Sequence, residues 1–558
     1  MQLHSVKLFG TYKALKGTAD HPIEITFHQT RENFSPICLV GLNGSGKSSF
    51  IELIADIFCY ADRHLNRQFG ARSDLPYDFE IEYGILRDDK LTNVKLCGAA
   101  GKLKMILGKS QKVQSDVMRE YLPDKVVAYS SGHNQGLSTV FSKNQYAFFD
   151  AIRKQGKFHK NYQLQYSKFR GDGSREDDLI LRRLKEYQAT SYKRNPKLFE
   201  TPGQETPEFD PHTVLQTIPP NPPTVIFSDH DANQLIFIAA CLARKEAFNQ
   251  LTRDEIGVSG LTSFELDLQL TSYKEIEFVE EAVKRLISVA SDSSNFDADR
   301  LKGRLHFKND SDFTRKLEEV FVEGSEGIFN LLHFLWLLSA KKWGRDETVA
   351  LKTANYLNNV PIPAGGLAPV RVINCRVRLT NPDVETLYDR LSDGEHQFAQ
   401  ILGALCLFGD RNTLFILDEP ESHFNPHWRA EFVEITQRAI RSVNRNSGWP
   451  GIVISTHSPF VVSGCKKENV FKFARVADDV SVSHPADETY GASFDYLLSS
   501  LFDMDVLMAT QARDELRNVL RDGNVNQLKA AKSFFGNSIE KAAIFVRLAE
   551  LEKSRDQK

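Results

Sequence analysis

The stretch PICLVGLNGSGKSSFIELIADIF, residues 36–58, joins an apolar run, a glycine-rich turn and a segment with apolar residues at helical spacing. The run ICLV predicts a buried β-strand, and residues 49–58 predict a helix. Between them, Gly41–Ser48 matches the pattern G-x-x-x-x-G-K-[ST] in full. A glycine-rich turn between a buried strand and a helix predicts an α/β fold with a phosphate-binding loop (P-loop).

Each residue type of this loop has a chemical role. Glycines let backbone N–H groups turn toward phosphates, Lys47 supplies positive charge to the β- and γ-phosphates, and the hydroxyl of Ser48 is a ligand for Mg²⁺. The residues expected to bind ATP here are Asn43, Gly44, Ser45, Gly46, Lys47, Ser48 and Ser49.

A second apolar run, TLFILDEP at residues 413–420, ends in two carboxylates. A buried strand ending in Asp418 can hold Mg²⁺ through its water shell, and Glu419 can polarise the attacking water as the catalytic base. Acidic residues also follow strands as helix N-caps, but a cap explains neither the unbroken apolar run nor Pro420.

A third apolar run, GIVIS at residues 451–455, leads into Thr456 and His457. Because it is the next strand along the chain, His457 is expected to reach the γ-phosphate and to act in catalysis. Strands alternating with helices predict a parallel sheet.

Together with LSDGEHQ, residues 391–397, these three pieces resemble the ABC-type ATPase heads. The resemblance implies that Ser392, Gly394 and Glu395 begin a helix and bind the ATP held by an opposite subunit, in a head-to-tail dimer or a higher oligomer. ABC transporters have a second glycine and a glutamine where this chain has Asp393 and Glu395. That departure points away from transporters.

The continuation DEPESHFNP, residues 418–426, resembles the SMC-, RecF- and OLD-related heads, the AAA_21 class. By this resemblance, residues 422–425 form the loop that crosses the dimer interface. Gln135, in YSSGHNQ, is a candidate for the glutamine with which such heads sense Mg²⁺.

Within that class, the chain lacks the long coiled coils of SMC proteins and the acid clusters of the OLD nucleases, and it is longer than RecF-like proteins. It is most similar to the PtuA ATPases of Septu anti-phage systems, including those attached to retrons. The resemblance implies a partner HNH nuclease (PtuB-like) and, in retron systems, a reverse transcriptase with its branched msDNA. Two function classes stay open: a regulatory ATPase that controls a nuclease partner, and a repair ATPase of SMC/RecF type that acts on DNA directly.

The predicted fold class is an α/β ABC-ATPase head, a P-loop parallel sheet with an antiparallel β side-sheet, divided by a mostly helical insertion. The predicted parts are residues 1–135 and 371–480 for the head, 136–370 for the insertion, and 481–558 for a helical tail. A Pro-rich connector, residues 201–224, lies within the insertion.

The most basic region is residues 153–197, with 13 Lys or Arg against five Asp or Glu, interleaved with Phe158, Tyr162, Tyr166, Phe169 and Tyr192. Cations neutralise phosphates and aromatic rings stack on unpaired bases, so this region is a candidate nucleic-acid interface. The alternative is a solvated helix face. The candidate contacts are Arg153, Lys154, Lys157, Lys160, Lys168 and Arg170.

Net charge, cysteine spacing and the length of apolar runs limit which other classes of protein the chain could belong to. A formal net charge of -3 excludes a chain that is basic throughout, so any nucleic-acid contact is regional. Seven scattered cysteines without a C-x-x-C pair argue against a disulfide framework and a zinc site. The longest apolar run, residues 328–340, is shorter than the ~20 residues of a membrane span. These features predict a soluble cytoplasmic protein without a membrane partner.

Overall fold

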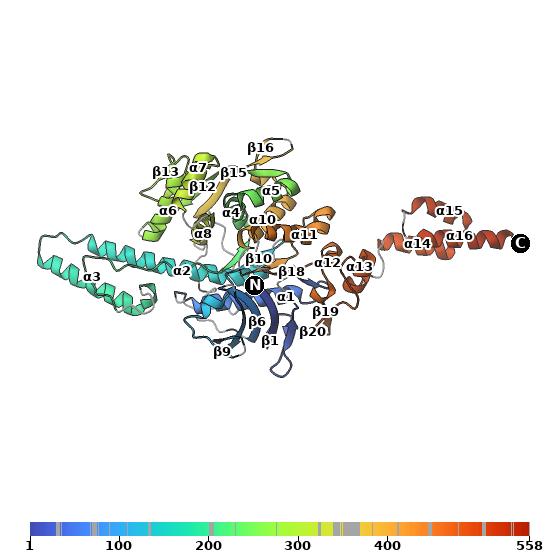
Figure 1. Ribbon diagram of the computed structural model, residues 1–558, viewed down its shortest axis with the longest axis horizontal. Helices are drawn as coiled ribbons and strands as arrows, with labels where there is room; N and C mark the ends of the chain where they lie inside the picture. Colours follow the sequence, from blue (N-terminus) through green and yellow to red (C-terminus); the bar gives the residue numbers. More distant parts are fainter. Residues whose placement is uncertain are drawn as a thin grey trace. The chain divides into compact units, whose positions relative to one another are not determined.

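The computed structural model forms two compact units, residues 1–492 and 493–558, which are described separately (Figure 1). The description covers the chain except residues 29–33, 35, 67, 70–74, 76, 89, 109, 132–134, 200–205, 229, 275, 322–324, 339–345, 347–348, 350–368, 382, 410–411, 445–448, 478, 505–508, 537, 539–540 and 557–558, and the side chains of residues 135, 230–232, 245, 325–326 and 552–556.

The first unit is built around a seven-stranded sheet in which all neighbours run parallel except the last pair. Its strands are, in spatial order, β11 (Val225–Ser228), β10 (Lys125–Ser130), β17 (Thr413–Asp418), β18 (Gly451–Ser455), β5 (Ile37–Val40), β19 (Val470–Val476) and β20 (Asp479–Ser483). The carboxyl ends of β17, β18 and β5 therefore lie side by side at one edge of the sheet. The three predicted polar tips lie at this edge.

Alternate residues of these strands enter two separate cores, because successive side chains point to opposite faces of a sheet. On β17, Leu414 and Ile416 belong to the core that includes helix α1 (Lys47–Leu65). Phe415 and Leu417 belong to the core that includes α10 (Asp393–Phe408). Helices α1 and α10 consequently cover opposite faces of the central sheet.

An antiparallel side-sheet packs on the α1 side of the first unit, since its buried residues share the core of α1. Its strands are, in spatial order, β4 (Ile23–Thr26), β1 (Gln2–Phe9), β6 (Asp78–Arg87), β7 (Lys90–Ala99), β8 (Lys102–Leu107) and β9 (Gln111–Lys112). A two-stranded hairpin, β2 (Thr11–Tyr12) and β3 (Leu15–Lys16), lies between β1 and β4 in the sequence. The predicted fold class, a P-loop parallel sheet with an antiparallel side-sheet, is confirmed.

The predicted insertion is mostly helical but also contains strands that the sequence analysis missed. A third, antiparallel sheet has the order β13 (Phe296–Asp297), β14 (Lys302–Lys308), β12 (Val258–Gln269), β15 (Val370–Leu379) and β16 (Glu385–Leu387). Around it lie α4 (His230–Ala243), α5 (Lys245–Ile256), α6 (Glu277–Val289), α7 (Ser311–Val320) and α8 (Ser325–Leu337).

Two strands differ from their predicted places. β11, within the predicted insertion, pairs with β10 in the central sheet. Its apolar run, Val225–Phe227, is only three residues long and follows the Pro-rich connector, so the sequence analysis did not find it. β15, expected to resume the head, pairs with β12 in the third sheet. Its second half alternates buried and exposed residues, which is typical of an antiparallel strand with one solvated face.

The basic region forms an arm of two helices, α2 (Gln135–Tyr166) and α3 (Arg175–Arg194), which lie side by side in Figure 1. The arm lies in sequence between β10 and β11, two neighbouring strands of the central sheet. Asp177, in the first turn of α3, accepts backbone N–H bonds from Arg170, Asp172 and Gly173, so one carboxylate organises the turn between the two helices.

The second unit is helical: α13 (Phe494–Phe502), α14 (Thr510–Asp522), α15 (Val525–Phe534) and α16 (Lys541–Asp556). The last three helices share a small core that includes Leu516, Leu528 and Ile544. Among the residues that the structure describes, no helix of either unit combines the length and the apolarity needed to cross a membrane.

Candidate functional site

The glycine-rich turn forms a cradle between β5 and α1. Gly41 has a φ of 138°, and a Cβ on it would lie 2.2 Å from the carbonyl oxygen of Phe473, so only glycine fits there. Nζ of Lys47 donates to the carbonyl oxygens of Gly41 (2.8 Å) and Leu42 (3.1 Å). Burial lowers the pKa of Lys47 to about 8, although the charges of Glu419 and Asp418 oppose this shift.

The other predicted loop residues line the same turn. Asn43, Gly44 and Ser48 are exposed, Ser49 is partly exposed, and Ser45 and Gly46 are buried. Oγ of Ser45 is buried and has no hydrogen-bond partner in the described chain. Burying a hydroxyl group without a hydrogen-bond partner costs free energy. Oγ of Ser45 is therefore a group that a bound ligand can satisfy.

Asp418 ends β17, and its side chain is buried and surrounded by hydroxyl groups. Oγ of Ser455, at the end of the neighbouring β18, donates to Oδ1 of Asp418. Oγ of Ser130, at the end of β10 on the other side, lies 3.4 Å from Oδ2. The sequence analysis did not select these two serines. Each is the last residue of a buried strand, and that position was the signal that could have found them.

Glu419 and His457 follow β17 and β18, and their side chains meet. Nε2 of His457 lies 3.5 Å from Oε1 of Glu419. Burial and the charge of Asp418 raise the pKa of Glu419, while burial and the charge of Lys47 lower the pKa of His457. The lowered pKa favours the neutral form of His457, and the carboxyl group of Glu419 lies beside it.

Glu419 has a φ of 48°, a left-handed conformation that non-glycine residues rarely adopt. Its backbone N–H donates to the carbonyl oxygen of Ser455 at 3.1 Å, which holds the strained residue against β18. Strain of this kind is concentrated at functional sites.

Glu421 is a further buried carboxylate that the sequence analysis did not select. Its Oε1 accepts a hydrogen bond from the hydroxyl of Thr456, and its Oε2 is buried without a partner in the described chain. Burial raises the pKa of Glu421 to about 7. This hydrogen bond therefore links Glu421, two residues after Glu419, to Thr456, which directly precedes His457.

The stretch LSDGEHQ forms the start of α10, and its polar residues cap that helix. Ser392 is the N-cap: its Oγ accepts from the backbone N–H of Glu395, whose carboxylate accepts from the N–H (2.7 Å) and the hydroxyl (2.8 Å) of Ser392. This is a capping box, and the spacing S-x-x-E could have predicted it. The carboxylate of Glu395 thus has a local role, while Ser392 is exposed.

Gly394 and Gln397 connect α10 with residues 421–425. A Cβ on Gly394 would lie 2.7 Å from the carbonyl oxygen of His423, so glycine permits the close approach. The amide of Gln397 donates to Oγ of Ser422 and accepts from the N–H of His423. The predicted interface loop is thus fixed to the helix that begins with Ser392.

The residues at this edge of the sheet fit ATP with Mg²⁺. Lys47 and the exposed Ser48 begin α1 after the loop that follows β5, and the buried Asp418 ends β17. Ser48 and Asp418 offer a hydroxyl and a carboxylate oxygen, which Mg²⁺ prefers as ligands. The orphaned Oγ of Ser45 and the cradle at Gly41 supply the phosphate-facing side. Gln135 begins α2, but its side chain lies outside the described residues.

The six candidate nucleic-acid contacts all lie on the arm, but they are not equivalent. Arg153 and Lys154 both pair with Asp150, at 2.6 and 2.9 Å, and Arg170 lies 3.9 Å from Glu176. Lys157, Lys160 and Lys168 are exposed and make no ion pair in the described chain.

The aromatic residues of the arm correct the sequence analysis. Phe158, Tyr162 and Tyr192 are 5%, 2% and 8% exposed, so they cannot stack on bases as predicted. Phe158 and Tyr192 instead form a local core with Leu198 and Phe199. The reason is the hairpin: two amphipathic helices bury their aromatic faces against each other and against the following turn.

Comparison with known proteins finds a family match for part of the chain. Residues 381–463 match the family AAA_21, described as "AAA domain, putative AbiEii toxin, Type IV TA system". The matched residues include Ser392, Asp418, Glu419 and His457. No curated protein matches the chain.

Among solved structures, the chain is similar to the SMC head domain from Thermotoga maritima. The sequence identity is 10%, the TM-score is 0.31, and the match covers 87% of this chain and 99% of that chain. With a TM-score this low, the fold assignment rests on the strand order and the P-loop described above. The P-loop between β5 and α1 and the parallel order of the central strands are those of a P-loop nucleotide-binding fold, and the AAA_21 match covers residues 381–463 of it.

Proposed function

We propose that the chain is an ABC-type P-loop ATPase that binds ATP and hydrolyses it to ADP and phosphate, and that ATP joins two copies head to tail. The observation that carries the proposal is that Lys47, at the start of α1, interacts with Asp418, Glu419 and His457, which lie at the ends of the adjacent strands β17 and β18. Mg²⁺ held by Ser48 and Asp418 would offset the charge of the phosphates.

The residues of this chain have distinct roles in hydrolysis. Lys47 and the loop amides hold the phosphates, and Glu419 accepts the proton of the attacking water. Neutral His457, adjacent to Glu419, donates or accepts a hydrogen bond at the γ-phosphate. Ser130 and Ser455 hold the carboxylate of Asp418 in place.

Dimerisation is supported by the placement of α10. Helices α1 and α10 cover opposite faces of the central sheet, so the sheet separates Ser392 from the Lys47 of the same chain. A second copy is needed to bring an exposed Ser392 and the N-terminus of α10 to the phosphate held by Lys47. Gln397 and Gly394 would couple that contact to residues 421–425 beside the catalytic base.

We propose further that this ATPase is the regulatory subunit of an anti-phage system of Septu or retron type. Its ATP state would hold or release a partner HNH nuclease. The resemblance of the motifs to the PtuA ATPases supports this role. The arm would contact nucleic acid, including retron msDNA where a reverse transcriptase is part of the system.

The test of the head is Glu419→Gln. This variant should bind ATP with unchanged affinity, hydrolyse it at least about 100-fold more slowly, and elute as a dimer with ATP and Mg²⁺. Size-exclusion chromatography with light scattering measures the dimer. Glu434→Gln, the same change at an exposed position on α11 (Pro426–Val443), is the control. Normal hydrolysis by Glu419→Gln would falsify the assignment of the base.

The test of the regulatory role uses the purified chain and the proteins encoded beside it. Co-purification with a small nuclease, whose activity changes with the ATP state, supports regulation. DNA-stimulated ATP turnover by the chain alone would favour the repair-type alternative. Reversing the charges of Arg153, Lys154, Lys157 and Lys160 should weaken nucleic-acid binding and reduce its salt dependence; unchanged binding contradicts the arm as an interface.

A further inference from the structure

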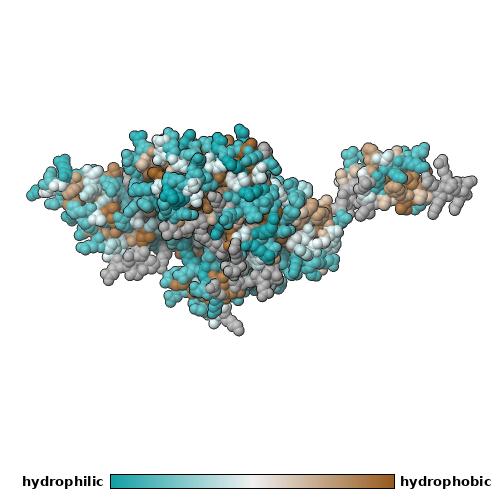
Figure 2. Space-filling model, turned by 45° about the horizontal axis from the view of Figure 1, so that its top comes forward, coloured by the Kyte–Doolittle hydropathy of each residue, from teal (hydrophilic) through white to brown (hydrophobic). Residues whose placement is uncertain are grey.

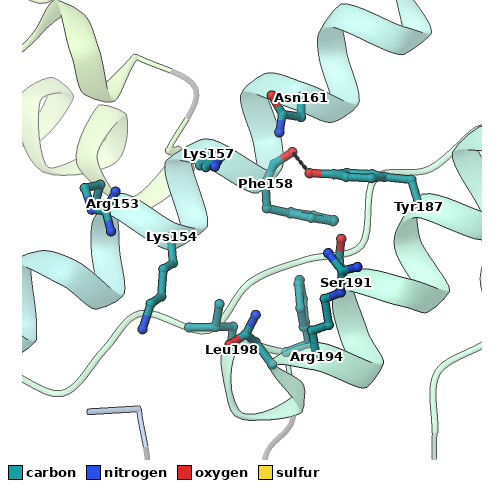
Figure 3. A pocket seen from close by; sticks show the side chains of 11 residues that line it. Arg153, Lys154, Lys157, Phe158, Asn161, Tyr187, Ser191, Arg194 and Leu198 are labelled. Carbon is teal, nitrogen blue, oxygen red and sulfur yellow. Dashed lines mark hydrogen bonds between the residues drawn. The ribbon is translucent and has the colours of Figure 1, made fainter. Parts of the chain in front are cut away.

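A pocket of about 370 Å³ lies in the arm, between the second half of α2, the last two turns of α3 and the short helix η2 (Pro196–Leu198) (Figure 3). The described residues that line it are Arg153, Lys154, Lys157, Phe158, Asn161, Tyr187, Ser191, Arg194, Asn195, Leu198 and Phe199. None of these belongs to the ATP site of the head. The surface of the arm that Figure 2 shows is mostly hydrophilic, with scattered hydrophobic residues.

The apolar side of the pocket is preformed. The ring of Tyr187 stacks on Phe158 with a centroid distance of 5.5 Å and an interplanar angle of 8°. Phe199 contacts Phe158 edge to face at 4.9 Å, and the hydroxyl of Tyr187 donates to the carbonyl oxygen of Phe158 at 3.4 Å. Phe158 is buried, but Tyr187 is partly exposed. The partly exposed ring of Tyr187 is consequently held against Phe158 at the wall of the pocket.

The charged side of the pocket is strongly positive. Four cations line it, and one carboxylate, Asp150, pairs with two of them. Lys157 of α2 and Arg194 of α3 are exposed and make no ion pair in the described chain. None of the described lining residues is acidic. Cations that belong to different helices but border one cavity are unlike a uniformly solvated helix face, in which charges point away from one another.

Neutral polar groups complete the lining. The side-chain amides of Asn161 and Asn195 and the hydroxyl of Ser191 have no hydrogen-bond partner among the described residues. They offer both donors and acceptors. A ligand that suits the pocket therefore has an anionic group, a flat ring and several hydrogen-bonding atoms.

We propose that this pocket binds one nucleoside phosphate, either free or as the phosphorylated terminal nucleotide of a nucleic-acid strand. Arg194 and Lys157 contact the phosphate, where charge-assisted hydrogen bonds are strong. The base lies against Tyr187, and the two asparagines bind its edge. The volume falls near the lower end of the ~300–1,000 Å³ of small-molecule sites, which suits a single nucleotide rather than a duplex.

The proposal deepens the nucleic-acid contact of the arm and rests on that contact, not on ATP-driven dimerisation. It replaces a diffuse basic surface with a discrete site. A diffuse surface binds a strand through its whole backbone, so the state of the strand's end has no effect on affinity. A terminal-nucleotide site distinguishes a phosphate from a hydroxyl at that end.

The experiment measures fluorescence anisotropy of single strands of about ten nucleotides, labelled at the 3′ end, with a 5′-phosphate or a 5′-hydroxyl. The full-length chain carries Lys47→Ala, so that the P-loop does not contribute. AMP is added as an unlabelled competitor. The phosphorylated strand should bind at least about tenfold more tightly than the hydroxyl strand.

Two matched double variants locate the site. Lys157→Glu with Arg194→Glu should weaken binding of the phosphorylated strand at least about tenfold and remove the preference for phosphate. Arg183→Glu with Lys185→Glu makes the same charge change at exposed residues of α3 that neither line the pocket nor belong to the six candidate contacts, and should cost less than about threefold. All four positions are exposed, and equal thermal melting temperatures verify the fold of both variants.

The outcomes separate the two sources of the ligand. AMP that competes with a Kd no higher than that of the phosphorylated strand assigns the pocket to free mononucleotides, whereas AMP that competes with a Kd at least about tenfold higher assigns it to strand ends, and either supports the proposal. A phosphorylated strand that AMP does not displace at all overturns the pocket. Equal losses in the two double variants, or equal affinity for both strands, overturn the pocket and leave the diffuse interface. Absence of all binding overturns the pocket and the nucleic-acid contact together, while ATP-driven dimerisation is unaffected.

Discussion

Nε2 of His457 lies 3.5 Å from Oε1 of Glu419, although the two residues end different strands. The parallel pairing of β17 with β18 creates this contact, because Asp418 is level with Ser455 and each functional residue follows within two positions. The contact joins a neutral imidazole and a carboxylate of raised pKa at the place where the attacking water is expected.

ATP hydrolysis should slow on the acid side. Glu419 acts as a base only when it is ionised. Because its pKa is raised above 4.5, the ordinary value for glutamate, Glu419 becomes protonated at a higher pH than an ordinary glutamate does. The measurement is kcat from pH 5 to pH 8, with tryptophan fluorescence to verify folding. A rate that stays constant down to pH 5 would contradict Glu419 as the base.

Lys47 should make nucleotide binding depend on pH in the opposite range. The pKa of Lys47 is lowered to about 8, so the ammonium is present below that pH and is lost as the pH rises through it. The Kd for ATP with Mg²⁺ should consequently rise between pH 7 and pH 9, by up to about tenfold per pH unit above the pKa. In Lys47→Ala, affinity should be low and no longer change over this range, as isothermal titration calorimetry can measure.

Ser392→Arg should separate ATP binding from dimerisation. The substituted side chain blocks the exposed start of α10 but leaves the P-loop unchanged, so the monomer binds ATP and neither dimerises nor hydrolyses it. Ser174→Arg is a matched control because Ser174 is the N-cap of α3 on the arm. Both variants lose a cap worth about 1 kcal/mol, yet only the first should lose the dimer.

The stability of the head should depend on Glu421. Its pKa in the folded chain is about 7, above the 4.5 of an ordinary glutamate. A raised folded-state pKa contributes stability that is fully present below pH 4.5 and is lost as the pH rises through 7, for a total of about 3 kcal/mol. Glu421→Gln keeps an acceptor for Thr456 and removes the titration.

The measurement is the melting temperature at pH 5 and pH 8. Glu421→Gln should exceed the unsubstituted chain by more at pH 8 than at pH 5, while Glu434→Gln should follow the unsubstituted chain at both. The same displacement of Glu421→Gln at the two pH values would show that Glu421 does not titrate in this range.

The local patterns in the sequence predicted the elements that carry their own signal. Gly41–Ser48 could be found because a phosphate loop is contiguous, and β17 and β18 because an unbroken apolar run ending in polar residues is typical of a buried strand. β11 was missed because its short apolar run directly follows the Pro-rich connector and, unlike that of β5, leads into no recognisable motif. The capping box of Ser392 and Glu395 was readable from its spacing but was not used.

Contacts between distant residues could not be predicted in this way. Ser130 is 288 positions from Asp418, and only the order of the strands brings their side chains together. The aromatic residues of the arm have the composition of a stacking surface, but the hairpin turns most of them into a core. Glu421 is one more acidic residue in an acidic stretch until its burial beside Thr456 distinguishes it.

The sequence by itself determined that the chain has a P-loop, an acidic strand and a histidine strand in that order, since each is encoded by neighbouring residues. Only the tertiary structure decided which side chains meet and on which face of the sheet each helix lies, because side-chain contacts depend on strand order and on burial. The role of Lys47 could therefore be assigned from the motif Gly41–Ser48 alone. That Ser392 and Lys47 belong to helices on opposite faces of the sheet could be inferred only from the fold.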